Sequence, residues 1–143
     1  VSLKLNSSSF VETEKGTQMP EKNTSVSEVP SCDFSSLKPI LKDIDDERLG
    51  LGYDMHFNFN QIITDEPQIT LANDQYQLDI YTDFQGTQIY SDNFVRNTKF
   101  INNEVETTRR GVAIEPQDSH LWDHILRKDV LYKRFINYKF SVK

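Results

Sequence analysis

The sequence has a single cysteine and no long apolar run, and each of these absences excludes a class of protein. Cys32 is the only cysteine among 143 residues, so an internal disulfide and a zinc site made of thiolates are excluded, and a reducing compartment is indicated. No apolar stretch approaches the roughly 20 residues that a membrane-spanning helix needs. The first residues also lack the basic start, apolar core and cleavage site of a secretion signal. We therefore expect a cytoplasmic protein with no membrane partner.

Basic residues are fewer than acidic ones, which argues against nucleic acid as a partner. The chain has 16 Lys and Arg against 22 Asp and Glu, for a net charge of −6. The basic residues are scattered and do not alternate with aromatic residues in a stripe, as a nucleic-acid surface would. With 36% hydrophobic residues, a chain of 143 residues is long enough for one domain with a sizeable core.

Alternation of apolar and polar residues predicts short β-strands, most clearly at residues 53–59. Four apolar side chains share one face of this segment, namely Tyr53, Met55, Phe57 and Phe59. Three polar side chains share the other face, namely Asp54, His56 and Asn58. The apolar face is predicted to belong to the core. The polar face either meets solvent or lines a polar cleft, and alternation alone does not distinguish these two arrangements.

The same pattern predicts strands elsewhere along the chain, at residues 3–6, 10–13, 68–72, 76–82, 87–91 and 135–142. Asn73-Asp74 has the composition of a hairpin turn between two of these strands. Many short strands with little helix are typical of an all-β fold. We therefore predict an antiparallel β-sandwich.

The segments between these strands are predicted to be turns and connections. Residues 7–9 form a turn, and residues 14–29 form a long surface connection with a short strand at 25–29. Residues 35–44 have apolar residues at helical spacing but contain a proline, so at most one or two broken turns are expected there. One or two helical turns are also predicted within residues 118–127, and brief strand pairing at residues 99–101.

Residues 109–117 contain the most distinctive polar group of the chain. Val112 and Ile114 would point to one face of a strand, and Ala113 and Glu115 to the other. Proline cannot donate to a sheet ladder, so Pro116 predicts that the strand ends at Glu115 or becomes irregular there. A carboxylate at a strand end, beside a small residue, leaves room for a ligand. The alternative is an acidic residue on a solvated face.

Residues 111–117, Gly-Val-Ala-Ile-Glu-Pro-Gln, resemble the segment that carries the catalytic glutamate in aldose 1-epimerases, the galactose mutarotases. Other segments resemble that family in the same order: Met19-Pro20, Asp33-Phe34, Gly52-Tyr53-Asp54, residues 81–94 and Tyr138-Lys139-Phe140. Within residues 81–94 the similarity is to Tyr-Thr-x-x-Pro-Gly-x-Gln-x-Tyr-x-x-Asn-Phe.

The sequence departs from the family pattern at several positions. Glu21 and Lys22 replace a Thr and a Gly after Met19-Pro20, and Gln85 replaces a Pro. Met55 stands where the family usually has a histidine after the aspartate. His56 follows one place later and so points to the opposite face from Met55, which means that it does not simply replace the missing group.

The resemblance implies that residues 1–143 are the carboxy-terminal portion of one aldose-epimerase domain, an antiparallel supersandwich present only in part. Family members are about twice as long, and two site histidines and a site arginine lie in their other half. The start at Val1, without an initiator Met, agrees with this expectation. The implied partners are a monosaccharide substrate and the amino-terminal half of the same protein.

The resemblance also implies the roles of individual residues in mutarotation, the ring opening and closure that interconverts α and β anomers. Glu115 is the general base that takes the proton of the anomeric hydroxyl, and a histidine of the other half is the acid. Asp54 accepts hydrogen bonds from sugar hydroxyls. Gln88 and Tyr90 are further candidates for lining the site, although a packed position in the sheet is the favoured interpretation of Tyr90. No metal or cofactor is needed.

Two other functions stay open. One is a carbohydrate-binding β-sandwich without turnover, suggested by Met55 and by the absent histidines. The other is a hexose-6-phosphate epimerase, in which Arg109-Arg110 would clamp the phosphate, although one arginine is expected to pair with an acidic neighbour and the other to be solvated. His120 and His124 are spaced to share a metal on a helix, but a surface cluster is the favoured interpretation.

Overall fold

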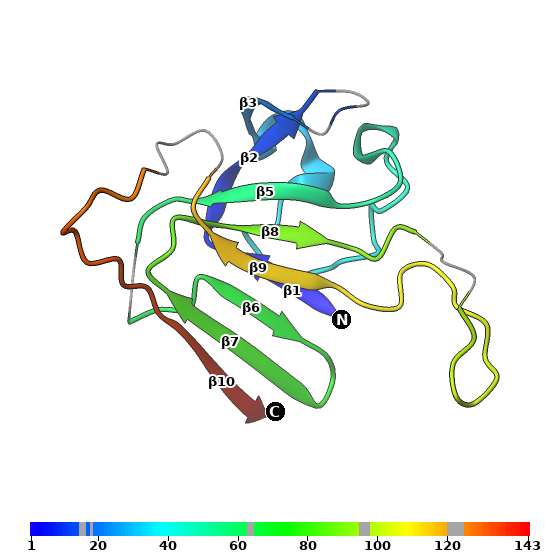
Figure 1. Cartoon of the computed structure of the whole chain (residues 1–143). Helices are drawn as coiled ribbons and strands as arrows, with labels where there is room; N and C mark the ends of the chain where they lie inside the picture. Colours follow the sequence, from blue (N-terminus) through cyan, green and yellow to red (C-terminus); the bar gives the residue numbers. More distant parts are fainter. Residues whose placement is uncertain (15–16, 18, 63–64, 95–97, 120–124) are drawn as a thin grey trace.

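Two five-stranded antiparallel sheets pack against each other in the computed structural model, which describes residues 1–14, 17, 19–62, 65–94, 98–119 and 125–143 (Figure 1). Sheet A has the strand order β10 (Ile136–Val142), β7 (Tyr76–Thr82), β6 (Ile69–Ala72), β1 (Ser2–Leu5) and β4 (Lys38–Pro39). Sheet B has the order β3 (Pro20–Ser25), β2 (Ser7–Thr13), β5 (Asp54–Phe59), β8 (Gly86–Tyr90) and β9 (Ala113–Gln117).

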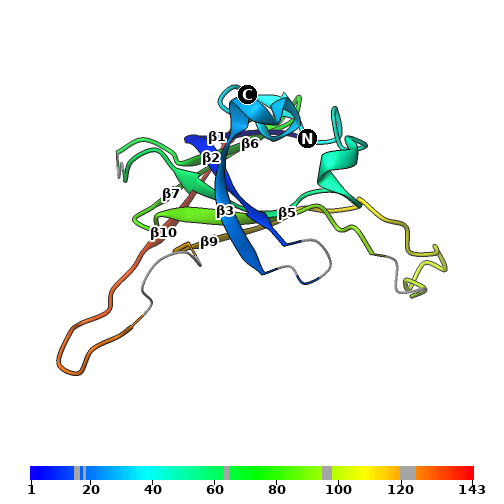
Figure 2. The same ribbon diagram turned by 90° about the horizontal axis from the view of Figure 1, so that it is seen from above.

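The helical segments of these ranges are three short 3-10 turns: η1 (Val26–Glu28), η2 (Pro30–Cys32) and η3 (Glu47–Leu49). No helix among the described residues has the length and apolar character to cross a membrane. Two long connections, residues 98–112 and 125–135, project from opposite sides of the sheets (Figures 1 and 2). The predicted all-β antiparallel sandwich is therefore confirmed.

The core lies between the sheets because each sheet buries one alternating face. Sheet A contributes Leu3 and Ile69, and sheet B contributes Phe57 and Ile89, all 0% exposed. The ring of Phe34, between β3 and β4 in the chain, meets Phe57 edge-on with 6.0 Å between ring centroids. Each buried side chain of this size contributes roughly 1.5–3 kcal/mol to the free energy of unfolding.

Most predicted strands are confirmed, since β1, β5, β6, β7, β8 and β10 begin and end within a residue or two of the predicted bounds. The hairpin at Asn73 is also confirmed, because Asn73 N donates to Tyr76 O. The brief pairing near residue 99 is confirmed by a bridge between Lys99 and Val105. Part of residues 118–127 lies outside the described residues, so the helical turns predicted there stay a prediction.

The turn predicted at residues 7–9 is wrong, because these serines begin β2. The hydroxyl of Ser7 lies 2.6 Å from Asn58 O and 2.8 Å from Ser9 O. The β2–β5 register shifts between Ser7 and Ser9, which makes the start of β2 irregular. Serine favours turns locally, but here its hydroxyl bonds within the sheet instead.

Two further predictions between residues 14 and 44 are wrong. A strand, β3, lies where a surface connection was expected, and residues 26–28 form η1 instead of a strand. β3 is the edge of sheet B and carries mostly exposed polar residues, so it has no apolar alternation to reveal it. Lys38 and Pro39 pair with β1 as β4, and hydrogen-bonded turns follow at residues 40–45, in agreement with the one or two broken turns expected there.

The strand predicted to end at Glu115, or to become irregular just after it, instead continues in register through Pro116 to Gln117 as β9. Pro116 is tolerated because β9 is the edge strand of sheet B, and an edge strand needs to bond on one side only. The predicted division of faces is confirmed. Val112 and Ile114 pack against the core, and Ala113 and Glu115 belong to the other face.

The apolar face of sheet A continues past the core onto its edge strand, β10. Register places Tyr138 opposite Ile80 and Phe140 opposite Leu78, so these side chains share the inner face. Ile80 is 1% exposed, whereas Tyr138 is 55% and Phe140 is 77% exposed. Sheet B does not extend far enough to cover β10, which lies at the free edge of sheet A (Figure 1).

Candidate functional site

Three neighbouring strands of sheet B bring the candidate site residues together. Register places Gln88 of β8 opposite His56 of β5 on one side and opposite Glu115 of β9 on the other. It also places Tyr90 opposite Asp54. Opposed residues of antiparallel strands point to the same face, as do residues two apart on one strand. The four predicted site residues therefore share one face with His56.

This face lines a cavity of about 430 Å³, which we call the polar hollow. Its lining includes Asp54, Glu115, Gln88, Tyr90 and His56. The volume lies within the roughly 300–1,000 Å³ of small-molecule sites. Carboxylate, amide, imidazole and phenol groups together offer the donors and acceptors that a polyhydroxylated ligand requires. The polar face of residues 53–59 is thus part of a polar cleft, one of the two arrangements that alternation left open.

Asp54 and Gln88 are joined across the β5–β8 pair. The Gln88 Nε2 amide donates to Asp54 Oδ1 at 3.0 Å. A carboxylate has two oxygens and can accept several hydrogen bonds, so this contact orients Asp54 and leaves Oδ2 as an acceptor. Glu115 lies on the other side of Gln88 and is exposed, so a ligand in the polar hollow can reach its carboxylate.

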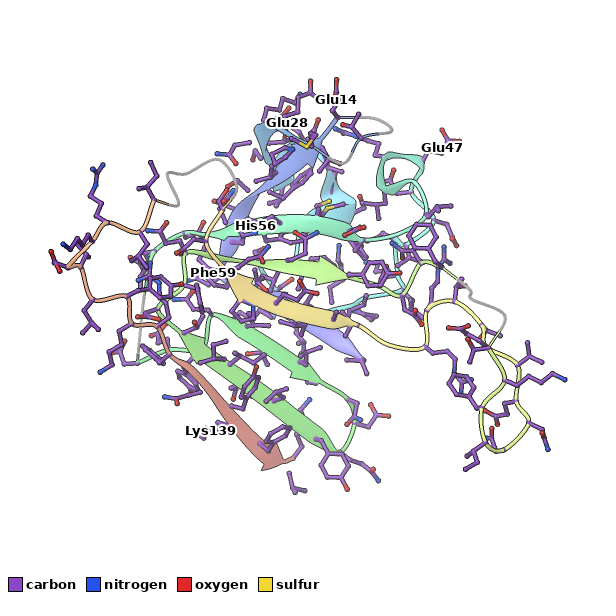
Figure 3. All side chains as sticks on the ribbon, in the orientation of Figure 1. Glu14, Glu28, Glu47, His56, Phe59 and Lys139 are labelled. Carbon is purple, nitrogen blue, oxygen red and sulfur yellow. The ribbon has the colours of Figure 1, made fainter. Side chains whose placement is uncertain are left out.

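His56 is the site residue that sequence reasoning set aside. It is 2% exposed and lies on β5 beside β8 (Figure 3). Gly86 makes this position possible, because a Cβ on residue 86 would overlap the His56 ring and the Phe57 carbonyl. The signal for its placement was the two-residue spacing between Asp54 and His56, which puts both on one face.

Met55, at the place of the family histidine, contacts Cys32. The Cys32 thiol lies 3.4 Å from Met55 Sδ. Cys32 itself is 0% exposed, and burial raises the pKa of its thiol to about 12. A thiol with so high a pKa is protonated at neutral pH and has no nucleophilic role.

Both arginines of the predicted phosphate clamp are occupied by carboxylates. Arg109 lies 2.9 Å from Asp45, and Arg110 lies 3.1 Å from Glu104 and stacks over the ring of Phe100. The predicted pairing with an acidic neighbour is confirmed and extends to both arginines, and Arg110 is also solvated, since 42% of its side chain is exposed. Among the described residues that line the polar hollow, none is Lys or Arg.

In the described part of the chain, no three His, Cys, Asp or Glu side chains gather in a group that could hold a metal ion. His120 and His124, the histidine pair considered for a metal, lie outside the described residues.

Comparison with known proteins places this arrangement of strands in a known fold. The chain matches a galactose 1-epimerase from Lactobacillus acidophilus with a TM-score of 0.75 and 21% identity, over 99% of this chain and 43% of that one. It matches a GalM/aldose epimerase homologue from C. elegans with a TM-score of 0.81 and 24% identity, over 99% of this chain and 45% of that one. The chain has the aldose-epimerase fold. No protein-family model and no curated protein matches the sequence.

The aldose-epimerase fold agrees with the resemblance that the short motifs indicated. The chain spans less than half the length of the two aldose-epimerase structures, so it has part of that fold. Identities of 21% and 24% support the fold, and activity and substrate must be argued from the side chains of the polar hollow.

Proposed function

We propose that this chain is part of an aldose 1-epimerase and carries its general base and part of its sugar-binding surface. The observation that supports this proposal best is the convergence of Asp54, Gln88, Tyr90 and Glu115 on one polar hollow. These residues come from three strands, and the sequence motifs predict a sugar site that contains Glu115 and Asp54. The proposed substrate is a hexose such as galactose or glucose.

The proposed mechanism requires one base and one acid. Glu115 takes the proton of the anomeric hydroxyl while an acid protonates the ring oxygen, and the ring opens to the free carbonyl. Rotation about the first carbon–carbon bond then presents the other carbonyl face, and the two groups exchange roles as the ring closes. Asp54 and Tyr90 hold the sugar hydroxyls so that the anomeric oxygen stays near Glu115.

The proposed acid is a histidine of an amino-terminal half, which is also the proposed partner of this chain. The uncovered inner face of β10 supports such a partner, because Tyr138, Phe140 and Val142 expose 55–77% of their surface there. Apolar surface of this kind is usually covered by another element or chain. A half-domain that packs on sheet A would cover the face and complete the sandwich.

A sugar-binding module without turnover is the second candidate. Its support is Met55, which stands at the position of the family histidine and contacts Cys32. A methionine side chain transfers no proton. A hexose-6-phosphate epimerase is disfavoured, because a phosphate needs positive charge. Among the described residues, the lining of the polar hollow includes the carboxylates of Asp54 and Glu115 and no Lys or Arg.

Polarimetry on fresh α-galactose tests the proposal in the complete protein, meaning this chain together with its amino-terminal half. We expect Glu115→Gln to lower the mutarotation rate roughly 10²–10⁴-fold, the usual effect of losing a positioned base. Sugar binding should persist because the amide keeps the size of the carboxylate. The matched control is Glu28→Gln, an exposed glutamate of η1, which should leave the rate unchanged. Near-normal activity of Glu115→Gln would remove Glu115 from the mechanism, and binding without turnover in the wild type would favour the second candidate.

A further inference from the structure

A buried hydrogen-bond network holds the residue that precedes Asp54. Tyr53 N donates to Ser91 Oγ at 2.9 Å, and Asn93 Nδ2 donates to Tyr53 O at 3.0 Å. Ser91 Oγ in turn donates to Asn93 Oδ1 at 2.6 Å. Ser91 is 2% exposed and Asn93 is 8% exposed, so water competes little for these bonds. Both backbone polar groups of Tyr53 therefore bond to the side chains of Ser91 and Asn93, and Tyr53 O also accepts from the backbone amide of Ser91 at 3.0 Å.

The same asparagine contacts the second sugar-facing residue. The backbone amide of Asn93, not its side chain, donates to Tyr90 Oη at 3.1 Å. A tyrosine hydroxyl has one donor and two acceptor positions. Because the oxygen of Tyr90 already accepts the bond from Asn93, the hydroxyl hydrogen can be donated to a sugar oxygen in the polar hollow.

The chain leaves room for this network by having a glycine before Tyr53. Gly52 has φ +139°, a conformation that other residues rarely adopt, and a Cβ there would overlap Asn93 Oδ1 and Ser91 Oγ. The loop that leads into β5 therefore packs directly on the Asn93 side chain.

We propose that Asn93 is a positioning residue for sugar binding. Its side chain holds Asp54 in place through the backbone of Tyr53. Its backbone amide, which is kept in any variant at this position, orients the Tyr90 hydroxyl as a donor. This inference rests on the proposed function, since it assigns Asp54 and Tyr90 to the sugar. Glu115 lies on β9, outside the network, so Asn93 acts on sugar affinity rather than on the proton-transfer step.

Steady-state kinetics of the complete protein with galactose separate these effects. Asn93→Ala is expected to raise KM about tenfold, as for the loss of roughly one well-placed hydrogen bond, and to change kcat by less than about threefold. Ser91→Ala, a smaller change in the same network, should also raise KM. It replaces Asn93→Ala as the test if that variant does not fold. An unchanged KM in both variants would overturn the proposal.

A double-mutant cycle tests whether the Asn93 side chain acts through Asp54. In a chain that already carries Asp54→Ala, adding Asn93→Ala should raise KM little further. A full tenfold rise in that background would show that Asn93 affects binding by another route and would overturn the assignment.

The matched control is Thr82→Val in sheet A, where the buried Thr82 Oγ1 donates to Phe135 O at 2.8 Å. It removes a buried hydrogen bond far along the chain from the polar hollow, so it should lower stability without raising KM. An equal rise in KM for Thr82→Val would mean that general loosening, and not positioning, explains the Asn93 effect.

Amide hydrogen exchange gives a readout that does not depend on activity. The Tyr53 amide should exchange slowly in the wild type and faster in Asn93→Ala. The reason is that the Tyr53 amide donates to the Ser91 hydroxyl, and the Asn93 side chain holds that hydroxyl in place. If the wild type neither binds nor converts galactose, the proposed function fails, while exchange still decides whether Asn93 holds this segment. Unchanged protection of Tyr53 would overturn the positioning role in either case.

Discussion

Individual residues of the polar hollow divide into those held by neighbours and those open to a ligand. Asp54 shows both properties, since Oδ1 accepts from Gln88 and the residue is only partly buried. A half-held carboxylate keeps its direction without losing its capacity to bind hydroxyls, which lowers the entropic cost of binding.

Asp54→Ala should weaken galactose binding roughly 10- to 100-fold, the effect of losing a hydrogen bond to a charged group. Turnover should also slow, because the sugar is held less well near Glu115. The free energy of unfolding should fall by no more than about 1 kcal/mol, since Asp54 lies on the polar face of β5 and not on the apolar face that packs in the core. Calorimetric titration and thermal unfolding measure the two effects, with Asp74→Ala at the exposed β6–β7 turn as control. A collapse of stability with unchanged sugar affinity would make Asp54 structural.

Cys32 should make stability fall at alkaline pH. Burial raises the pKa of its thiol from 9.0 to about 12, so the folded chain holds the proton more tightly than the unfolded chain. This contribution is complete below pH 9 and is lost as the pH rises toward 12, by at most about 1.4 kcal/mol per pH unit. Urea unfolding between pH 8 and 11 should show a shallower fall in stability above pH 9 for Cys32→Ala than for the wild type. Parallel curves would mean that the thiol does not titrate on unfolding.

At the scale of elements, β8 connects the parts of the site. It pairs with β5 on one side and β9 on the other, so Gln88 stands between His56 and Glu115. The close approach of β5 and β8 depends on Gly86, where a side chain would overlap both His56 and the backbone of Phe57.

Gly86→Ala should therefore destabilise the chain by roughly 1–3 kcal/mol, the usual cost of inserting a methyl group into a packed region. The matched control is Gly111→Ala, because a Cβ at Gly111 would meet no atom within 4 Å. Denaturant unfolding of the two variants measures the difference directly. Equal midpoints would show that β5 and β8 can separate without cost at this position.

At the scale of the whole molecule, the two sheets are unequally covered. Sheet B closes over β1 and β6, whereas the inner face of β10 remains exposed. An exposed edge strand with an apolar face is a site for association with another chain. The described fold therefore indicates a surface that a second chain or chain segment would cover.

The purified 143-residue chain should self-associate and lack mutarotase activity, and addition of an amino-terminal half should restore the activity. Phe140→Lys, at a residue that is 77% exposed, should reduce self-association measured by sedimentation. Ser141→Lys adds the same charge to the opposite face of β10 and should change association much less. A well-behaved, fully active monomer would contradict both the half-domain and the assignment of the acid to another half.

The sequence by itself determined the strands whose two faces differ in polarity. Alternation located β5 and β10, and the spacing around Glu115 predicted that Ile114 faces the core while Glu115 does not. Such patterns are local, because a strand places successive side chains on opposite faces whatever its partners are. Short motifs extended this to the fold, since they occur in the order of a family whose fold the chain has.

Only the tertiary structure decided which strands are neighbours, and this determines the site. Pro116 lies within a strand because β9 happens to be an edge, and β3 is a strand because β2 pairs with it. His56 belongs with Gln88 and Glu115 through the register of three strands that are distant in sequence. Pairing is set by contacts between remote segments, so no local pattern of residues contains it.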